Sequence, residues 1–337
     1  NGLPKAYSND PTQWVFHGHP CGAVVWDEEK QWIAHGPLRT DGTVLQVAVA
    51  RLLGYRWPAE FDPQMALADE QRELVGRCDE LLEFAAADGI VCIPPVDGEQ
   101  PASGRLQRLL AQAFGPAWTQ ATLPALLDPV GFSRKTLEDW LRDEFFEQHC
   151  QLFHQRPFVW HIWDGRRRDG FAALVNYHKL DRKLLERLAY TVLGDWIARQ
   201  RQGAKARERG AEERLAATEA LQQKLALILE GEPPHDIFVR WKPLREQPIG
   251  WEPDLNDGVR MNIRPFVEAG VLRKNPKIQW TKDRGKEPES LRPKDQYPWF
   301  WKDDQFTGER VNDAHFTNAE KRAARERIAS RPKGAAR

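Results

Sequence analysis

The chain has 337 residues, enough for about two domains, and its 41% apolar and 29% charged residues are typical of a folded globular protein. This composition excludes collagen-like, mucin-like and wholly disordered chains. The 49 Lys and Arg residues balance the 49 Asp and Glu residues, so the overall charge does not point to nucleic acid.

The charge is nonetheless distributed unevenly along the chain. The segment from Glu60 to Gln100 contains eleven acidic and two basic residues, a net charge of −9. The segment from Arg273 to Arg337 contains seventeen basic and ten acidic residues, a net charge of +7. This asymmetry indicates that a polyanionic partner contacts the late part of the chain only.

We expect free thiols, a cytoplasmic location and no membrane contact. The longest uncharged stretch, Leu109–Leu127, is interrupted by Gly, Pro and Gln. The chain starts at Asn1 rather than Met, so we expect it to be part of a longer protein. The cysteines are far apart in a chain too large to need disulfides, and they are Cys21, Cys78, Cys92 and Cys150.

Helices dominate the elements predicted for the first half. Loops and turns are expected from Asn1 to Asp41, followed by a helix that Thr40 or Asp41 caps and that ends near Leu52. Apolar spacing predicts a second helix over Gln64–Ala87 and a third over Ser133–Leu152. A short strand is expected at Ile90–Ile93.

Two hairpins are predicted next. Aromatic and β-branched runs at Phe158–Trp163 and Phe171–Tyr177 flank a loop that begins with Asp-Gly and ends with Asp-Gly, which predicts a β-hairpin. Matching apolar stripes predict an antiparallel pair of long helices over Asp181–Gln200 and Lys205–Glu230, with the break at Gln202–Gly203.

The last third is expected to be less regular. It contains a strand at Asp236–Trp241, a helix over Gly258–Ala269 and a basic helix that starts at the capping box Thr317–Glu320. The expected fold class is α+β, mainly helical, with β-hairpin elements and a long antiparallel helical hairpin. Three segments are expected: a partly acidic 1–130, a recognition or spacer region 131–272, and a basic, largely irregular tail 273–337.

Motifs for methyl transfer or nucleotide binding are missing from the sequence. No two glycines are closer than Gly18 and Gly22, so Rossmann-type and Walker-type phosphate loops are absent. No Asn/Asp-Pro-Pro-aromatic turn occurs, and the nearest approach, Glu232–His235, is interpreted as a helix stop. Carboxylate pairs and serines lack the spacing of a nuclease or hydrolase centre. An independent catalytic centre is not expected.

Two clusters of histidine and cysteine have residue types that bind metal ions. His17–Cys21 offers two imidazoles and a thiolate but lacks a second pair of ligands nearby, which favours a turn whose histidines bond to the backbone. The second cluster combines His149, Cys150, His154 and His161 and is likewise interpreted as structural. We expect no metal.

A binding surface for double-stranded DNA is the remaining interpretation. Three arginines lie at the tip of the predicted β-hairpin beside tryptophans, a combination of charge and stacking plane that nucleic-acid recognition uses. Two later basic runs have the same composition, whereas the Arg201–Arg214 stretch is interpreted as a solvated helix face. The candidate DNA-binding residues are Trp163, Arg166, Arg167, Arg168, Lys179, Arg240, Trp241, Lys242, Trp280, Lys282 and Arg284.

Four stretches resemble a known family. They are Asp10–Pro20 (DPTQWVFHGHP), Leu45–Glu60 (LQVAVARLLGYRWPAE), Arg156–Asp181 (RPFVWHIWDGRRRDGFAALVNYHKLD) and Asp236–Ala269, which includes WEPDLNDGVRMNIRPF. The chain resembles the C-terminal region of large adenine-specific DNA methyltransferases of bacterial phage-defence systems, the DISARM methylase above all. It resembles the BREX methylase and fused restriction–modification enzymes more distantly.

The resemblance implies a target-recognition and spacer region. It places the S-adenosylmethionine site and the Asn-Pro-Pro-aromatic turn in a catalytic half that this chain lacks, and it implies no catalytic residue here. The alternative is a protein-interaction scaffold, in which the helical hairpin docks the catalytic half or another defence subunit and the acidic segment faces a protein. A self-sufficient methyltransferase, which would bind S-adenosylmethionine, is a third alternative.

Overall fold

A computed structural model describes residues 18–231, 235, 241, 255–277, 292–307 and 318–330, with side chains described everywhere in these ranges except at 255–261 and 318. The chain divides into two compact units. The first comprises Asn1–Gln223 and Val271–Pro276, and the second comprises Lys224–Gly270 and Lys277–Arg337. The three segments expected from composition stay a prediction.

A three-stranded antiparallel sheet forms the centre of the first unit. Its order is β3 (Ile90–Cys92), β5 (Ala172–Asn176) and β4 (Val159–Trp163), and every residue of the middle strand β5 is buried. The segment after α11 extends the sheet beyond β4, because Trp163 N–H donates to the Val271 carbonyl at 2.9 Å and Leu272 pairs with Ile162. The expected hairpin and the Ile90 strand are confirmed.

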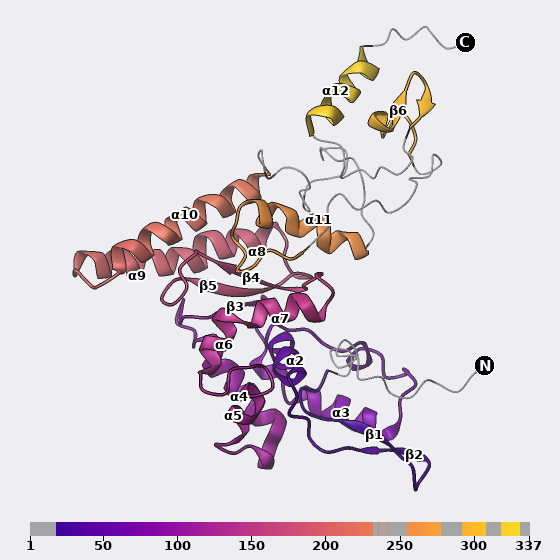
Figure 1. Ribbon diagram of the computed structural model, residues 1–337, viewed down its shortest axis with the longest axis vertical. Coiled ribbons are helices and arrows are strands. Elements are labelled where there is room, and N and C mark those ends of the chain that lie inside the picture. Colours follow the sequence, from indigo (N-terminus) through magenta and orange to yellow (C-terminus); the bar gives the residue numbers. More distant parts are fainter. Residues whose placement is uncertain are drawn as a thin grey trace. The chain divides into compact units, whose positions relative to one another are not determined.

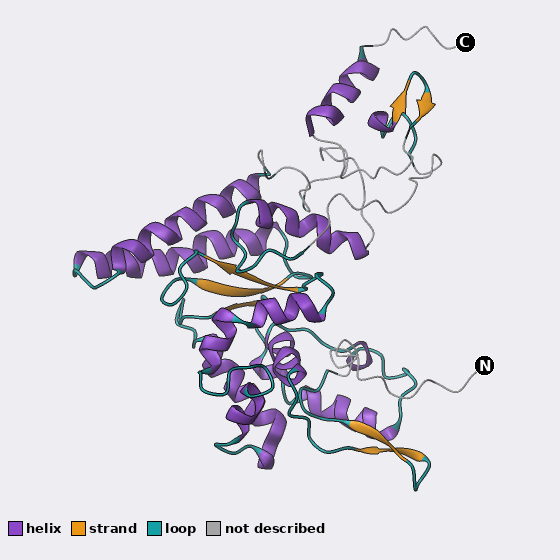
Figure 2. Ribbon diagram, in the orientation of Figure 1, coloured by secondary structure: helices purple, strands orange, loops and turns teal. Residues whose placement is uncertain are grey.

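Helices lie on both faces of this sheet (Figure 1). One face is covered by α6 and α7, and the other by α8 and α9. Helix is the commonest secondary structure among the described residues (Figure 2), which confirms a mainly helical α+β fold. The helices of this unit are α2 (Thr43–Leu52), α3 (Asp69–Asp79), α4 (Ala102–Phe114), α5 (Thr122–Leu127), α6 (Leu137–Asp143), α7 (Phe145–Leu152), α8 (Arg182–Glu186) and α9 (Leu193–Lys205).

The antiparallel helical hairpin is also confirmed. Its first arm runs from α8 through a π-helical segment, Arg187–Val192, into α9, and its second arm is α10 (Ala211–Glu230). A π segment shifts the backbone hydrogen bonds, and Gln222 Nε2 from α10 donates to the Ala189 carbonyl at 2.7 Å. The break lies at Ala206–Gly210 rather than at the predicted Gln202–Gly203, since Gly203 is still within α9.

The N-terminal loop prediction was wrong for part of its length. β1 (Val24–Asp27) and β2 (Trp32–His35) form an antiparallel hairpin within it. The turn between them is held by the Asp27 carboxylate, whose Oδ1 accepts the N–H groups of Glu29 and Lys30. Val24 is the one buried residue of these two strands, so the alternation of buried and exposed side chains that indicates a strand is weak here.

Two predicted helices have different bounds in the structure, and two further helices were overlooked. The helix expected over Gln64–Ala87 is restricted to α3 (Asp69–Asp79). Beyond α3 the chain packs against the end of α2, since the Ala86 N–H donates to the Leu52 carbonyl at 2.8 Å. The helix expected over Ser133–Leu152 starts later, at the Thr136 capping box, and breaks at Glu144 into α6 and α7. Helices α4 and α5 were not predicted; Gly115, with φ of 54°, lies between them.

In the second unit, α11 (Leu255–Glu268) and the basic helix α12 (Asn318–Ala329) confirm two predicted helices. A small hairpin of β6 (Trp301–Lys302) and β7 (Gln305–Phe306) precedes α12. The Trp299 ring lies 5.5 Å from Lys321 Nζ and 5.0 Å from the Arg325 guanidinium carbon, so cation–π contacts attach α12 to this hairpin segment.

The four cysteines are buried free thiols. Trp140 of α6 and Trp196 of α9 are buried as well. Among the described residues, no helix combines the length and the apolar character needed to cross a membrane.

Candidate nucleic-acid interface

The tip of the β4–β5 hairpin, Asp164–Gly170, is closed by one half-buried carboxylate. Asp164 accepts the N–H of Arg166 at 3.0 Å and that of Phe171 at 2.8 Å, and Thr218 on α10 donates its hydroxyl to it at 3.2 Å. Burial raises the pKa of Asp164, and these three donors oppose that rise by stabilising the charged form. The loop therefore has a defined shape rather than a solvated, variable one.

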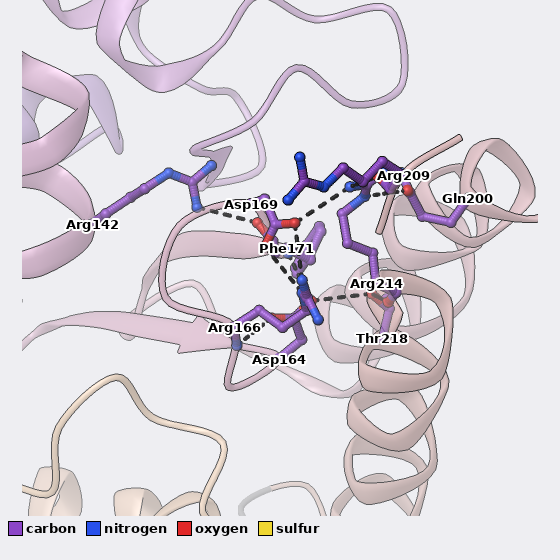
Figure 3. A network of polar contacts seen from close by, with 10 residues as sticks. Arg142, Asp164, Arg166, Asp169, Phe171, Gln200, Arg209, Arg214 and Thr218 are labelled. Atoms are coloured by element: carbon purple, nitrogen blue, oxygen red, sulfur yellow. Dashed lines mark hydrogen bonds and ion pairs between the residues drawn. The ribbon is translucent and has the colours of Figure 1, made fainter. Parts of the chain in front are cut away.

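Arg166 forms its ion pair within this loop. Its Nε and Nη2 atoms lie 3.0 Å from the two carboxylate oxygens of Asp169 (Figure 3). Asp169 Oδ2 is also 3.3 Å from Arg214 Nη1, and Arg214 Nε donates to Gln200 Oε1 at 2.6 Å. The hydrogen bond from Arg166 lowers the pKa of Asp169. This network attaches the hairpin tip to α9 and α10.

The opposite side of the tip is held by α6. Arg142 donates from Nη1 to the Gly170 carbonyl at 3.2 Å and from Nε to Glu138 at 2.8 Å. A Cβ atom at Gly170 would lie 2.2 Å from Asp164 Oδ1, so only glycine fits there. Helices on both sides thus fix the hairpin tip.

Arg167 and Arg168 take no part in this internal network. The Arg167 side chain is 72% exposed, with Nε 3.3 Å from Asp143 Oδ1. Arg168 is exposed and makes no ion pair within the described part of the chain. With Lys135 they line a pocket of about 600 Å³, which we name the α6 pocket. Its lining residues are Lys135, Thr136, Glu138, Asp139, Arg142, Asp143, Arg167 and Arg168.

The acidic side chains of the α6 pocket have partners within the protein, whereas two of its basic side chains have no ion pair in the described part of the chain. Each of its acids already has a partner: Glu138 pairs with Arg142, Asp143 pairs with Arg273 at 2.8 Å, and Asp139 accepts the Thr136 N–H in the capping box. Lys135 and Arg168 have no carboxylate partner among the described residues. Two cations of the pocket are therefore left without an ion pair in the described part of the chain.

Trp163 has two internal partners. Its Nε1 donates to the Leu272 carbonyl at 2.9 Å, and the Arg273 guanidinium carbon lies 4.2 Å from the ring centre. The ring is thus half-buried and one face is covered by Arg273. Trp163 supports the hairpin base instead of offering a free stacking surface.

Lys179 also has internal partners. Its Nζ donates to the carbonyls of Ala87 at 3.0 Å and Ala86 at 3.5 Å, which stabilises the turn before β3. Trp241 in the second unit is half-buried and donates to the Leu229 carbonyl at 3.1 Å. The remaining candidates, Arg240, Lys242, Trp280, Lys282 and Arg284, lie outside the described residues.

Residues of α6 and of the segment just before it complete this site, although no sequence pattern singled them out. Lys135, Arg142 and Asp143 come from a segment that looked like an ordinary amphipathic helix. The available signal was the basic pair Arg134-Lys135 just before the capping residue Thr136, since a side chain at a helix start stays outside the apolar stripe.

The buried histidines have structural roles. His19 Nδ1 accepts the Gly22 N–H at 2.7 Å, as a turn predicts, while His17 lies outside the described residues. His149 Nε2 accepts the N–H groups of Phe158 and Val159 at 3.2 and 3.1 Å. Within the described ranges no three His, Cys, Asp or Glu side chains lie close enough together to hold a metal ion.

No protein-family model matches this chain. A curated protein with sequence similarity to it is the adenine-specific methyltransferase PglX of Lacticaseibacillus casei (strain Zhang), with 31% identity over 83 residues. The similar stretch is 23% of this chain and only 7% of the length of that protein. The chain is thus distantly similar to part of an adenine-specific methyltransferase.

Proposed function

We propose that the chain is a DNA-binding target-recognition region of an adenine-specific DNA methyltransferase of a bacterial phage-defence system, of the DISARM type or related to the BREX methylase. The observation that carries this proposal is the α6 pocket, where Lys135 and Arg168 have no ion pair among the described residues and Arg167 is 72% exposed beside them, all on a rigid frame. Such cations contact DNA phosphates and release counterions, which is the main source of affinity for duplex DNA.

The rigidity of the hairpin tip supports this assignment. Phosphate contacts set the register of a protein on DNA, and they do so best when ordering the side chains costs little entropy on binding. The Arg166–Asp169–Arg214 network and the Arg142–Gly170 hydrogen bond hold the loop before DNA arrives. Arg167 and Arg168 are then presented together on one side of the tip.

Methyl transfer is assigned to a separate catalytic portion of the protein. S-adenosylmethionine sites of the Rossmann type need a parallel strand followed by a glycine turn and a helix. The described strands pair only antiparallel, and the glycine spacing of that turn is missing from the sequence. The described residues do not fit the cofactor, so no chemical step is assigned to them. Their role is to hold duplex DNA while the target adenine is flipped elsewhere.

The decisive experiment measures affinity for duplex DNA by fluorescence anisotropy. The double variant Arg167→Gln/Arg168→Gln is expected to bind about tenfold more weakly at about 0.1 M salt. The matched control, Arg108→Gln/Arg156→Gln, removes two exposed arginines outside the α6 pocket and is expected to bind as the wild type does. Equal affinity of both variants would refute the pocket as the DNA contact.

A protein-docking function is the second candidate, favoured by exposed tryptophans on the β1–β2 hairpin. Trp26 is 48% and Trp32 is 59% exposed, and His35 of β2 contacts Glu73 of the acidic helix α3 at 2.8 Å. An apolar and acidic surface suits a partner with apolar and basic groups, such as the catalytic methyltransferase portion. Loss of binding to that portion in Trp26→Ser/Trp32→Ser would support this function.

A further inference from the structure

The turn that joins α9 to α10 carries an arginine in a position that favours glycine. Arg207 has φ of 58°, and its N–H donates to the Ala204 carbonyl while the Glu208 N–H donates to the Gly203 carbonyl at 2.8 Å. This pair of hydrogen bonds is the Schellman motif, in which the left-handed residue is usually glycine because a Cβ atom is unfavourable there. The sequence keeps Arg207 at a conformational cost.

The cationic side chains of this turn have no internal partners. Lys205, Arg207 and Arg209 are exposed, and they form no ion pair within the part of the chain that the structure describes. The acids of the same segment are Glu208, which is folded against Gly203, and Glu212 and Glu213 in the first turn of α10. A helix N-terminus stabilises carboxylates at those two positions, so they have a local role.

The turn lies beside the hairpin tip. Arg214, four residues after Gly210, forms the ion pair with Asp169, and the Arg209 carbonyl accepts from the same guanidinium at 3.2 Å (Figure 3). A Cβ atom built on Gly210 would be 3.5 Å from Asp169 Oδ2. The turn and the loop that carries Arg167 and Arg168 are therefore parts of one fixed surface.

We propose that Lys205, Arg207 and Arg209 form a second phosphate-contacting surface for duplex DNA, which we name the α9–α10 turn. The inference rests on the proposed DNA-binding function and extends it to a segment that the sequence presented as a solvated helix face. The unfavourable φ of Arg207 is retained because the position supplies a cation next to the hairpin tip, where glycine would supply none.

Arg207→Gly separates binding from folding. Glycine suits the left-handed position, so the melting temperature is expected to stay the same or rise, while the affinity for duplex DNA falls about two- to fivefold. The triple variant Lys205→Gln/Arg207→Gly/Arg209→Gln is expected to lose about tenfold or more. Conversely, Glu212→Gln/Glu213→Gln is expected to bind duplex DNA more tightly. Lys183→Gln, an exposed lysine on α8, is the charge-matched control for a single lost cation.

The outcomes distinguish the two proposals. Wild-type protein that fails to bind duplex DNA would overturn both. If Arg167→Gln/Arg168→Gln weakens binding but the triple turn variant binds as the wild type does, only the turn proposal fails. If the triple turn variant weakens binding and Arg167→Gln/Arg168→Gln does not, the turn proposal stands and the α6 pocket is the wrong site. Polyglutamate serves as a probe for an acidic protein partner. If the wild type binds polyglutamate, the triple turn variant does not, and both bind DNA equally, the turn proposal is overturned in favour of such a partner.

Discussion

Arg166 and Asp169 face each other across the hairpin tip in a two-pronged ion pair, with both N–O distances at 3.0 Å. Three consecutive arginines in the sequence thereby acquire different roles. Arg166 holds the loop, whereas Arg167 and Arg168 lie at the α6 pocket. Substituting all three together would mix a folding defect with a binding defect.

Arg166→Ala and Arg168→Ala are expected to behave oppositely. Arg166→Ala removes a half-exposed ion pair and is expected to destabilise the protein by up to about 1 kcal/mol, with faster amide hydrogen exchange in Asp164–Gly170. Arg168→Ala is expected to leave the unfolding midpoint unchanged and to weaken DNA binding. Denaturant titration and hydrogen exchange of both variants test this. Equal stability of the two variants would contradict the structural role of Arg166.

The salt dependence of DNA binding measures the number of phosphate contacts. In Arg167→Gln/Arg168→Gln, the slope of log affinity against log salt concentration is expected to become shallower by about 2, because two cations no longer release counterions. Anisotropy titrations at several salt concentrations provide the slope. An unchanged slope with reduced affinity would indicate that these arginines act on the fold rather than on phosphates.

Two buried histidines are expected to respond differently to the same substitution. Neither ring nitrogen of His161 has a hydrogen-bond partner within the described part of the chain, and its ring contacts Phe146. His161→Phe is therefore expected to stabilise the protein by about 1 kcal/mol. His149→Phe removes the acceptor of two backbone N–H groups and is expected to destabilise it by about 2 kcal/mol. Chemical denaturation of both variants tests the contrast; destabilisation by His161→Phe would refute it.

Acid is expected to destabilise the fold through these same residues. Burial lowers the pKa of His149 to about 3, and burial together with Arg273 and Arg142 lowers that of His161 to about 3. The folded protein keeps both rings neutral, while the unfolded chain binds protons below a pKa of about 6.5. Stability is therefore lost as the pH falls from about 6.5 towards about 3, by up to about 1.4 kcal/mol per pH unit for each histidine.

The His161→Phe variant provides the control for this dependence. It is expected to lose less stability than the wild type between neutral and mildly acidic pH, because one of the proton-binding groups of the unfolded chain is gone. Unfolding free energies measured across that pH range give the comparison. Identical pH profiles of the two proteins would show that His161 binds protons equally in the folded and the unfolded chain.

The four cysteines are expected to be unreactive in the folded protein. Burial raises the pKa of Cys21, Cys78 and Cys150 to about 12 and raises that of Cys92 also. The thiolate, which is the reacting form, is therefore scarce and inaccessible. Ellman's reagent is expected to label no cysteine rapidly in native protein and four in denaturant. Rapid labelling of a single native thiol would locate a cysteine that burial does not protect.

Local sequence patterns predicted the elements whose partners lie nearby in the chain. The β4–β5 hairpin, with its Asp-Gly dipeptides, and the α8–α10 helical hairpin were predicted because their periodicity is set by the chain itself. The β1–β2 hairpin was missed because both of its tryptophans, Trp26 and Trp32, are exposed. The break at Glu144 was missed because the apolar spacing continues across it.

Sequence by itself thus determined a mainly helical α+β protein with a cluster of arginines at a hairpin tip. Only the tertiary structure decided which of these arginines can meet a partner. Arg166 is paired with Asp169, and Asp169 also contacts Arg214, 45 residues later in the chain. One face of the Trp163 ring is covered by Arg273, which comes from a distant segment. An internal ion pair reduces the charge that a side chain offers to a ligand, and pairing between distant segments does not follow from local spacing.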